Sequence, residues 1–406
     1  MLTVTLAWRN LFRNTRRTIL TSMLIGFSLT ALILTDGMIL GTLEVMVGGI
    51  THSLAGEAQI HKKGYLDNFD IDKYLDNPGQ IIDTIEQDSS VEAYAPRVMS
   101  GAMIASTYNV TGGMIYGVDY SRELGVSKIS AAVIEGEYLS GKGREILIGK
   151  PMTELLEVGL GDRIVITASQ ADTSDITQEL FRVSGIFEFG PKEMDENLVF
   201  INLPKAQELL ALEDKLHEIA IRFKEADDAK NRELQLYQSL NKDDIEALGW
   251  IDFNPAMGTM IEMTNFSTLL VGMILFLLAS LGVINSMFMS IYERIYEFGV
   301  AKAIGTRPIQ IVQLVLCEAL FLGILSCILG GILGFGLSSY YAEYGIPMGR
   351  MEVGNVVLDG NIYTKLAANQ FINFPIYVII LTVVAALYPA RFASKIMPSE
   401  ALQRSL

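Results

Sequence analysis

Hydrophobic residues are concentrated in four long runs, one near the N-terminus and three in the last third of the chain. The runs cover residues 19–43, 266–292, 309–341 and 371–387. A helix needs about 20 mainly apolar residues to cross the hydrocarbon core of a bilayer, and each run is near or above that length. The pattern therefore predicts an α-helical membrane protein with four transmembrane helices in a 1 + 3 arrangement.

Shorter patterns within the polar stretch 44–265 predict a large globular domain of mixed α/β structure. Strand-like stretches occur at 58–61, 113–118, 145–148, 163–168, 181–187, 198–201 and 218–223. Helical patterns occur at 78–88, 151–156, 204–212 and 226–240. Because strands dominate over about 131–202, we expect a strand-rich subdomain inserted within the rest of this domain.

The segments that flank the runs are short. Residues 1–18 place Trp8 and Phe12 four positions apart among arginines. This spacing predicts an amphipathic helix at the membrane surface, with a solvated basic flank as the alternative. Residues 342–370 are expected to form a short loop on the outer side, and residues 388–406 a cytoplasmic tail.

The formal net charge of −15 is distributed unevenly. Residues 44–262 hold 38 acidic and 19 basic residues, whereas the rest of the chain holds 8 acidic and 12 basic residues. Lys and Arg beside transmembrane helices stay in the cytoplasm, while long domains cross largely regardless of charge. Both termini and the loop 293–308 are therefore predicted to be cytoplasmic, with 44–265 outside. An acidic exterior argues against nucleic acid as a partner.

The sequence contains no residue pattern typical of a catalytic or metal site. Residues 136–143 approach the phosphate-binding pattern G-x-x-x-x-G-K-[ST], but Gly143 stands where the hydroxyl for Mg²⁺ is required. We expect a turn there. His52, His61 and His217 lack metal-ligand spacing. The chain is therefore expected to be non-catalytic and to bind no cofactor or metal.

The third run combines a carboxylate with many glycines. Glu318 lies about nine residues into the run, and a charge at that depth is costly unless it faces other helices or water. We expect a helix–helix hydrogen bond or a role in coupling, with a proton relay as the alternative. Gly330 and Gly334 form a G-x-x-x-G pattern that favours close helix packing, which we expect across a dimer interface.

The loop 293–308 carries the most specific pattern in the chain. Charged residues alternate there with small and apolar ones at helical spacing, which predicts a short amphipathic helix that docks a cytoplasmic partner. The residues expected to contact that partner are Glu293, Arg294, Glu297, Phe298, Gly299, Lys302, Ala303 and Gly305.

Together these motifs resemble the FtsX-like permeases of MacB-type ABC transporters, which include the lipoprotein-releasing Lol permeases. The resemblance rests on Glu297-x-Gly299-x-x-Lys302-Ala303-x-Gly305 and on Glu318 followed by a glycine-rich stretch. It rests also on a tail that contains Pro389, Arg391, Pro398 and Glu400. The layout of spans and the size of the outer domain fit the same family.

The resemblance implies a mechanism. A separate dimeric ATPase would bind ATP and Mg²⁺, contact the helix at 293–305, and move the transmembrane helices and the outer domain. That domain would resemble the family's porter subdomain and lie in the periplasm of a bacterium, with the chain in the inner membrane. A second permease copy, identical or related, would complete the transporter.

The resemblance leaves the substrate open. The length and the absence of a fused ATPase resemble the lipoprotein-releasing branch, in which the partners would be membrane lipids, a lipoprotein and a periplasmic chaperone. The stretch 168–177 is short, acidic and proline-free, unlike the chaperone-gripping hairpin of one Lol permease. The alternatives are efflux or peptide export of the MacB type, and regulation of cell-wall hydrolases of the FtsX type.

Overall fold

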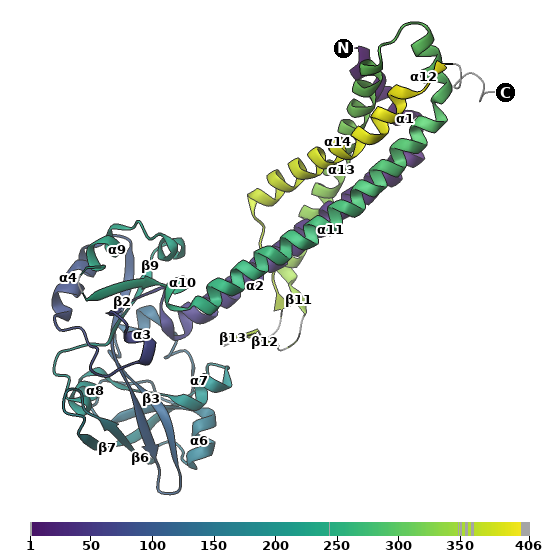
Figure 1. Cartoon of the computed structure of the whole chain (residues 1–406). Helices are drawn as coiled ribbons and strands as arrows, with labels where there is room; N and C mark the ends of the chain where they lie inside the picture. Colours follow the sequence, from purple (N-terminus) through teal and green to yellow (C-terminus); the bar gives the residue numbers. More distant parts are fainter. Residues whose placement is uncertain are drawn as a thin grey trace. The chain divides into compact units, whose positions relative to one another are not determined.

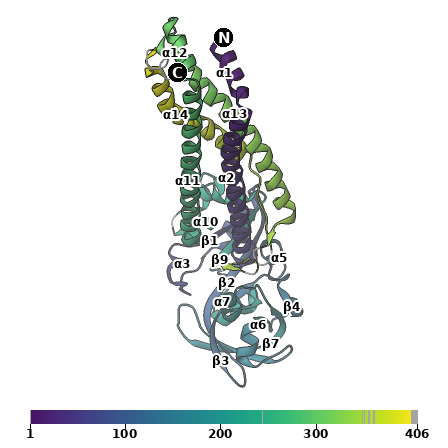
Figure 2. The same cartoon turned by 90° about the vertical axis from the view of Figure 1, so that its right-hand side faces the viewer.

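The computed structural model describes residues 2–242, 244–347, 349, 351–353, 356–358 and 361–398. The chain divides into two compact units (Figures 1 and 2). The helical unit comprises Met1–Leu43, Ile261–Met348 and Gly360–Leu406, and the extramembrane unit comprises Glu44–Met260 and Gly349–Asp359.

The helical unit contains six helices in its described part. They are α1 (Leu2–Arg13), α2 (Thr15–Ile50), α11 (Pro255–Glu293), α12 (Ile295–Ala303), α13 (Pro308–Tyr344) and α14 (Ala368–Lys395). Helices α2, α11, α13 and α14 are long and apolar enough to cross a membrane. The predicted set of four transmembrane helices is therefore confirmed.

The helices extend beyond the hydrophobic runs that predicted them. Helix α11 begins at Pro255 rather than near residue 266, and α14 continues to Lys395 rather than ending near residue 387. The continuation passes through Pro389, a residue that usually ends a helix. Hydropathy marks only where a helix contacts lipid, and the backbone hydrogen bonds continue into the polar sequence on either side.

The glycines of α13 pack against α2 of the same chain. A Cβ atom at Gly330 would lie 2.6 Å from the backbone oxygen of Gly26, and one at Gly334 would lie 2.9 Å from Ile33 Cδ1. Thr30 of α2 also donates a hydrogen bond to the Gly330 carbonyl at 3.1 Å. The expectation that these glycines serve a dimer interface is wrong, because the chain's first span occupies that face.

The extramembrane unit is built on one large mixed sheet of ten strands among the described residues. Its order is β10-β1-β9-β2-β3-β8-β5-β7-β4, and β6 pairs with β2 and β7. The strands are β1 (Ala58–Lys62), β2 (Val91–Ala105), β3 (Val110–Val118), β4 (Val133–Gly136), β5 (Glu145–Gly149), β6 (Arg163–Ser169), β7 (Ile176–Phe187), β8 (Leu198–Asn202), β9 (Glu218–Phe223) and β10 (Ile245–Gly249).

Short helices and turns connect the strands. They are a π-helical turn (Thr51–Ala55), α3 (Tyr65–Asn68), α4 (Pro78–Gln87), α5 (Glu123–Val126), α6 (Lys150–Leu156), α7 (Lys192–Asn197), α8 (Leu203–Leu210), a 3₁₀ turn (Ala226–Lys230), α9 (Gln235–Leu240) and α10 (Trp250–Phe253). With the sheet they form the predicted mixed α/β domain.

Several elements differ from the sequence expectations, and strands β4 and β10 are among those that were not predicted. Strand β2 was not predicted, although it pairs with three neighbours. The helix expected over 226–240 is interrupted, because the Asn231 side chain accepts the Glu233 N–H and forms a local turn instead. The loop expected over 342–370 contains two small hairpins, which pair β11 (Ile346–Pro347) with β14 (Asn361–Ile362) and β12 (Met351–Val353) with β13 (Val356–Leu358).

Candidate functional site

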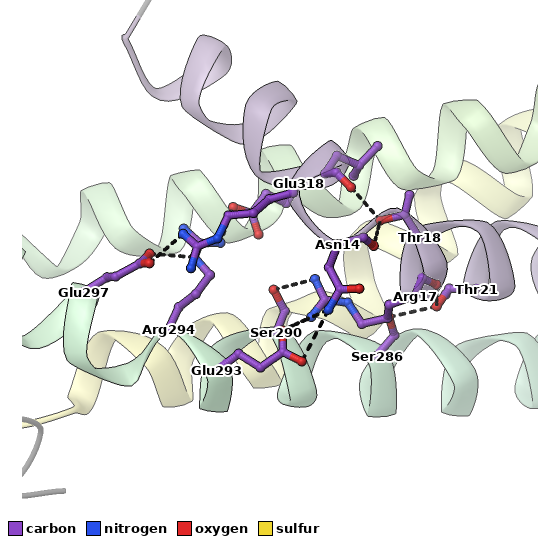
Figure 3. A network of polar contacts seen from close by, with 12 residues as sticks. Asn14, Arg17, Thr18, Thr21, Ser286, Ser290, Glu293, Arg294, Glu297 and Glu318 are labelled. Carbon is purple, nitrogen blue, oxygen red and sulfur yellow. Dashed lines mark hydrogen bonds and ion pairs between the residues drawn. The ribbon is translucent and has the colours of Figure 1, made fainter. Parts of the chain in front are cut away.

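A network of charged and amide side chains lies where α1, the α11–α12 junction and α13 meet (Figure 3). We call it the inner polar cluster, because it lies at the end of the helical unit that is predicted to be cytoplasmic. Its members come from segments up to 308 positions apart. They are Asn10, Arg13, Asn14, Arg17, Ser290, Glu293, Arg294, Glu297 and Glu318.

A buried ion pair forms the centre of the inner polar cluster. Arg294 Nη1 donates to Glu318 Oε1 at 2.7 Å, and Asn10 Nδ2 donates to the same oxygen at 2.6 Å. The two charged side chains are only 9% and 6% exposed. A carboxylate in a span is tolerated when such donors neutralise it. The expected helix–helix hydrogen bond of Glu318 is confirmed, and it joins α13 to α1 and to the junction.

More exposed ion pairs extend the cluster to α12 and α2. Glu297 pairs with Arg13 at 2.5 Å and with Arg294 at 3.2 Å. Arg17 pairs with Glu293 at 2.8 Å and donates to Ser290 Oγ at 3.1 Å. Partial burial acts to raise the pKa of Glu297, but hydrogen bonds from the two arginines outweigh it, so the net shift is downward. Glu297 therefore stays ionised and keeps α12 tied to α1.

Local backbone features define where α12 begins and ends. Arg294 leaves the helical conformation, with φ −117° and ψ 15°, and so separates α11 from α12. Glu297 lies in the first turn of α12, where a negative charge interacts favourably with the helix dipole. Gly305 adopts φ +108°, a conformation that favours glycine, and Pro308 then starts α13.

The two faces of α12 have different surroundings. Phe298 and Gly299 are buried against the membrane helices. Lys302 Nζ donates to the carbonyl oxygens of Ser394 and Ile396, at 2.9 and 2.8 Å, which fixes the end of α14 beside α12. On the outer face Tyr296 is 49% exposed, and Ile304, just after the helix, is 82% exposed.

The structure separates the predicted contact residues into two groups. Glu293, Glu297, Ala303 and Gly305 are exposed, whereas Arg294, Phe298 and Gly299 are buried and Lys302 bonds the end of α14. The buried group lies inside the helical unit and orients α12. Sequence reasoning missed Asn10, Arg13 and Arg17 as partners of this loop, because residues 1–18 were interpreted as a helix at the membrane surface or as a basic flank that sets topology.

The predicted tail residues lie in different places. Pro389 is buried within α14, Arg391 is exposed on the same helix, and Pro398 follows its end. Glu400 lies outside the described residues. Gly330 and Gly334 do not belong to the inner polar cluster, since they pack on α2.

These features define an integral membrane protein with four spanning helices, an inner polar cluster beside the short helix α12 and a large mixed α/β extramembrane domain. Residues 18–235 match the family model of the MacB-like periplasmic core domain, and residues 269–398 match that of the FtsX-like permease C-terminal region.

Individual relatives agree with these matches. The lipoprotein-releasing system transmembrane protein LolC of Xylella fastidiosa is 24% identical over 331 residues, which is 78% of each chain. The macrolide export ATP-binding/permease protein MacB of Acinetobacter baylyi is 33% identical over 149 residues, or 36% of this chain and 20% of that protein.

Among solved structures, the periplasmic region of MacB from Actinobacillus actinomycetemcomitans aligns with 12% identity and a TM-score of 0.38. The alignment covers 54% of this chain and 98% of that one. Because the MacB-like core model alone spans more than half of the sequence, the family is established. The chain belongs to the FtsX-like, MacB-type family of ABC transporter permeases.

Proposed function

We propose that this chain is the permease subunit of a mechanotransmission-type ABC transporter, in which ATP hydrolysis in a separate ATPase moves the extramembrane domain. The observation that carries this proposal is α12. Its outer face exposes Tyr296, and Ile304 is exposed directly after its end, while its other side is held by a buried ion pair and by Lys302. A helix held in this way moves as a rigid body when the ATPase displaces it.

The inner polar cluster supplies the route from α12 to the spans. Movement of α12 displaces Arg294 and Glu297, which bind Glu318 of α13 and Arg13 of α1. Charged hydrogen-bonded pairs have directional geometry, so they transmit the displacement of α12 to α13 and α1. Helix α12 itself need not insert into the membrane. In this proposal the ATPase dimer binds ATP and Mg²⁺, and this chain binds no cofactor and catalyses no reaction.

The second part of the proposal concerns the substrate. We infer extraction or release of lipoproteins, or of another lipophilic substrate, from the bacterial inner membrane, with the extramembrane unit in the periplasm. Support comes from the lipoprotein-releasing relative, which aligns over 78% of the chain. A second permease copy would complete the transporter. MacB-type efflux or peptide export is the second candidate, supported by the higher identity of the macrolide exporter over a shorter segment.

Co-purification tests the substrate assignment. The chain is expressed with its candidate ABC ATPase and purified in mild detergent, and its bound molecules are identified by mass spectrometry before and after ATP addition. Acylated proteins that dissociate on ATP addition are the expected result. If only small export substrates or no acylated protein are recovered, the lipoprotein assignment is wrong.

Variants of the exposed face test the coupling assignment. Ile304→Glu, and separately Glu297→Lys with Gly305→Trp, should weaken ATPase association by about tenfold or more without loss of membrane insertion, since both disturb the proposed contact. Ile176→Glu is the matched control, because Ile176 is 75% exposed but belongs to the extramembrane unit. Unchanged association and ATPase rates in both test variants would contradict the coupling role of α12.

A further inference from the structure

The extramembrane unit contains a cavity that the proposed coupling role does not use. Its volume is about 440 Å³, within the range of sites for small organic ligands. Much of the lining is apolar and includes four methionines, whose flexible thioether side chains adapt to apolar bodies of varied shape. The methionines are Met46, Met194, Met257 and Met260.

One wall of the cavity is charged. Arg97 is fully buried, and its Nη1 donates to Glu218 Oε1 at 2.6 Å, while Nε and Nη2 donate to Glu123 at 3.1 and 2.5 Å. Two carboxylates therefore share one guanidinium. Nearby His61 adds no positive charge at neutral pH, because burial lowers its pKa to about 4. With both carboxylates ionised, the buried group has a net negative charge; burial raises the pKa of Glu218, against the opposing effect of Arg97.

The second oxygen of Glu218 lacks a donor. Glu218 is 3% exposed and lines the cavity, and no described residue donates a hydrogen bond to its Oε2. The nearest charged candidate is His61 Nε2 at 3.9 Å. Because Glu218 lines the cavity, a ligand bound there can supply the missing donor.

Two neutral polar groups face the same space. Tyr116 and Asn254 both line the cavity. The Tyr116 hydroxyl and the Asn254 Nδ2 amide make no hydrogen bond to another residue in the described part of the chain, although Asn254 Oδ1 accepts the Met257 N–H. The site therefore combines polar groups that are free to bind a ligand with an apolar, methionine-rich wall.

We propose that this cavity binds a small amphiphile that carries one protonated amine. The ammonium group donates to Glu218 Oε2 and balances the net negative charge, and the apolar body packs against the methionines. An anion would meet the excess carboxylate, and a ligand without a donor would leave Oε2 unpaired. The amine belongs either to a free molecule from outside the cell or to an aminophospholipid headgroup.

Binding of an isosteric pair of probes to the full chain tests the ligand class. The chain is prepared in neutral maltoside micelles and titrated with cyclohexylmethylamine or cyclohexylmethanol, followed by saturation-transfer NMR against empty micelles. The amine should bind about tenfold or more tightly than the alcohol, since both can donate a hydrogen bond to Oε2 but only the ammonium carries the opposite charge. Equal binding of the two probes, or no binding of the amine, would overturn the proposal.

Variants locate the binding in the cavity. Glu218→Gln should remove the preference for the amine, and Met257→Trp should block both probes by filling the space. Glu188→Gln and Met103→Trp are matched controls at exposed positions of the same unit and should bind like the native chain. Amine binding that survives both Glu218→Gln and Met257→Trp would place the ligand elsewhere and contradict the assignment.

A lipid competition experiment identifies the source of the amine. If added phosphatidylethanolamine displaces the probe and phosphatidylglycerol does not, the natural ligand is the aminophospholipid headgroup. If neither lipid displaces the probe, the ligand is a free amine. Displacement by phosphatidylglycerol alone would contradict the cation preference.

Discussion

The ion pair between Arg294 and Glu318 shows how single residues position the coupling segment. Neither charge would be stable alone at its depth in the helical unit, because desolvating an unpaired ion costs several kcal/mol. Together with Asn10 they satisfy one another across three segments of the chain. The pair therefore specifies one register of α12 relative to α13.

A double-mutant cycle measures this pairing. We expect Glu318→Ala to lower the free energy of unfolding in bicelles by about 3–5 kcal/mol, because it leaves Arg294 buried without a partner. The Arg294→Ala/Glu318→Ala double variant should lose less than the sum of the single variants, by roughly 1–3 kcal/mol. Glu293→Ala, which breaks an exposed pair, is the control and should cost less than about 1 kcal/mol. Strict additivity would show that the pair does not act as a unit.

Two buried histidines make the extramembrane unit sensitive to acid. Burial lowers the pKa of His61 and His217 to about 4, whereas both titrate near 6.5 when unfolded. Between these values the unfolded state binds more protons than the folded state. The stability that depends on neutral histidine is therefore complete above about pH 6.5 and is lost as the pH falls toward 4.

Urea unfolding at several pH values tests this dependence. In a Trp8→Phe background, the fluorescence of Trp250 reports on the extramembrane unit, since the sequence holds only two tryptophans. We expect the free energy of unfolding to fall below pH 6.5 by up to about 1.4 kcal/mol per pH unit for each histidine. Burial raises the pKa of Glu218 and so opposes this trend. A shallower slope in His61→Gln therefore isolates the histidine effect, and an identical slope would exclude it.

At the scale of elements, the packing of α13 on α2 depends on glycines that allow two backbones to approach closely. Gly330 and Gly331 are adjacent but have opposite surroundings. A Cβ at Gly330 would meet the Gly26 backbone at 2.6 Å, whereas one at Gly331 would meet nothing within 4 Å. Gly331 is therefore a matched control for the contact between Gly330 and α2.

Alanine substitution at the two positions should have opposite effects. Gly330→Ala should destabilise the helical unit by about 1–3 kcal/mol, because the helices must separate to admit the methyl group. Gly331→Ala should be neutral or stabilising by up to about 1 kcal/mol through helix propensity. Thermal unfolding in the same detergent measures both. Equal effects at the two positions would show that α2 does not lie against Gly330.

The sequence predicts elements well where one physical signal dominates. The spans follow from hydropathy, and strands such as β5 and β8 follow from dense β-branched and aromatic residues. Strand β2 escapes prediction because Pro96 and Gly101 interrupt it, and only pairing with β3, β6 and β9 compensates for them. The extent of α14 beyond Pro389 also depends on tertiary contacts.

The sequence predicted where the candidate site lies, but it did not predict which residues of the site bind one another. The charged, small and apolar residues of 293–308 indicated a docking segment, and the depth of Glu318 indicated a polar contact between helices. The sequence could not show that Arg294 binds Glu318, or that Arg13 binds Glu297, because these pairs join segments from separate parts of the chain. Long-range pairing of this kind leaves no local pattern.

At the scale of the whole molecule, the chain joins two units with different physical roles. The helical unit contains α12 and the inner polar cluster. The extramembrane unit has a hydrophobic core of its own, built on one sheet. Helices α2 and α11 run continuously from one unit into the other. In the proposed mechanism, the displacement of α12 therefore reaches the extramembrane unit along these helices, and the substrate does not cross the membrane through a channel in this chain.

Double electron–electron resonance between the two units tests this central claim most directly. Spin labels are placed at Tyr108→Cys and Tyr344→Cys, two exposed positions in different units, with native Cys317 and Cys327 replaced by alanine. Labelled chain is diluted with unlabelled chain and assembled with its ATPase. We predict that trapping with ATP and vanadate shifts the distance distribution, and that Ile304→Glu abolishes the shift. The same distribution in the nucleotide-free and trapped states of an assembled, ATP-hydrolysing complex would contradict the account.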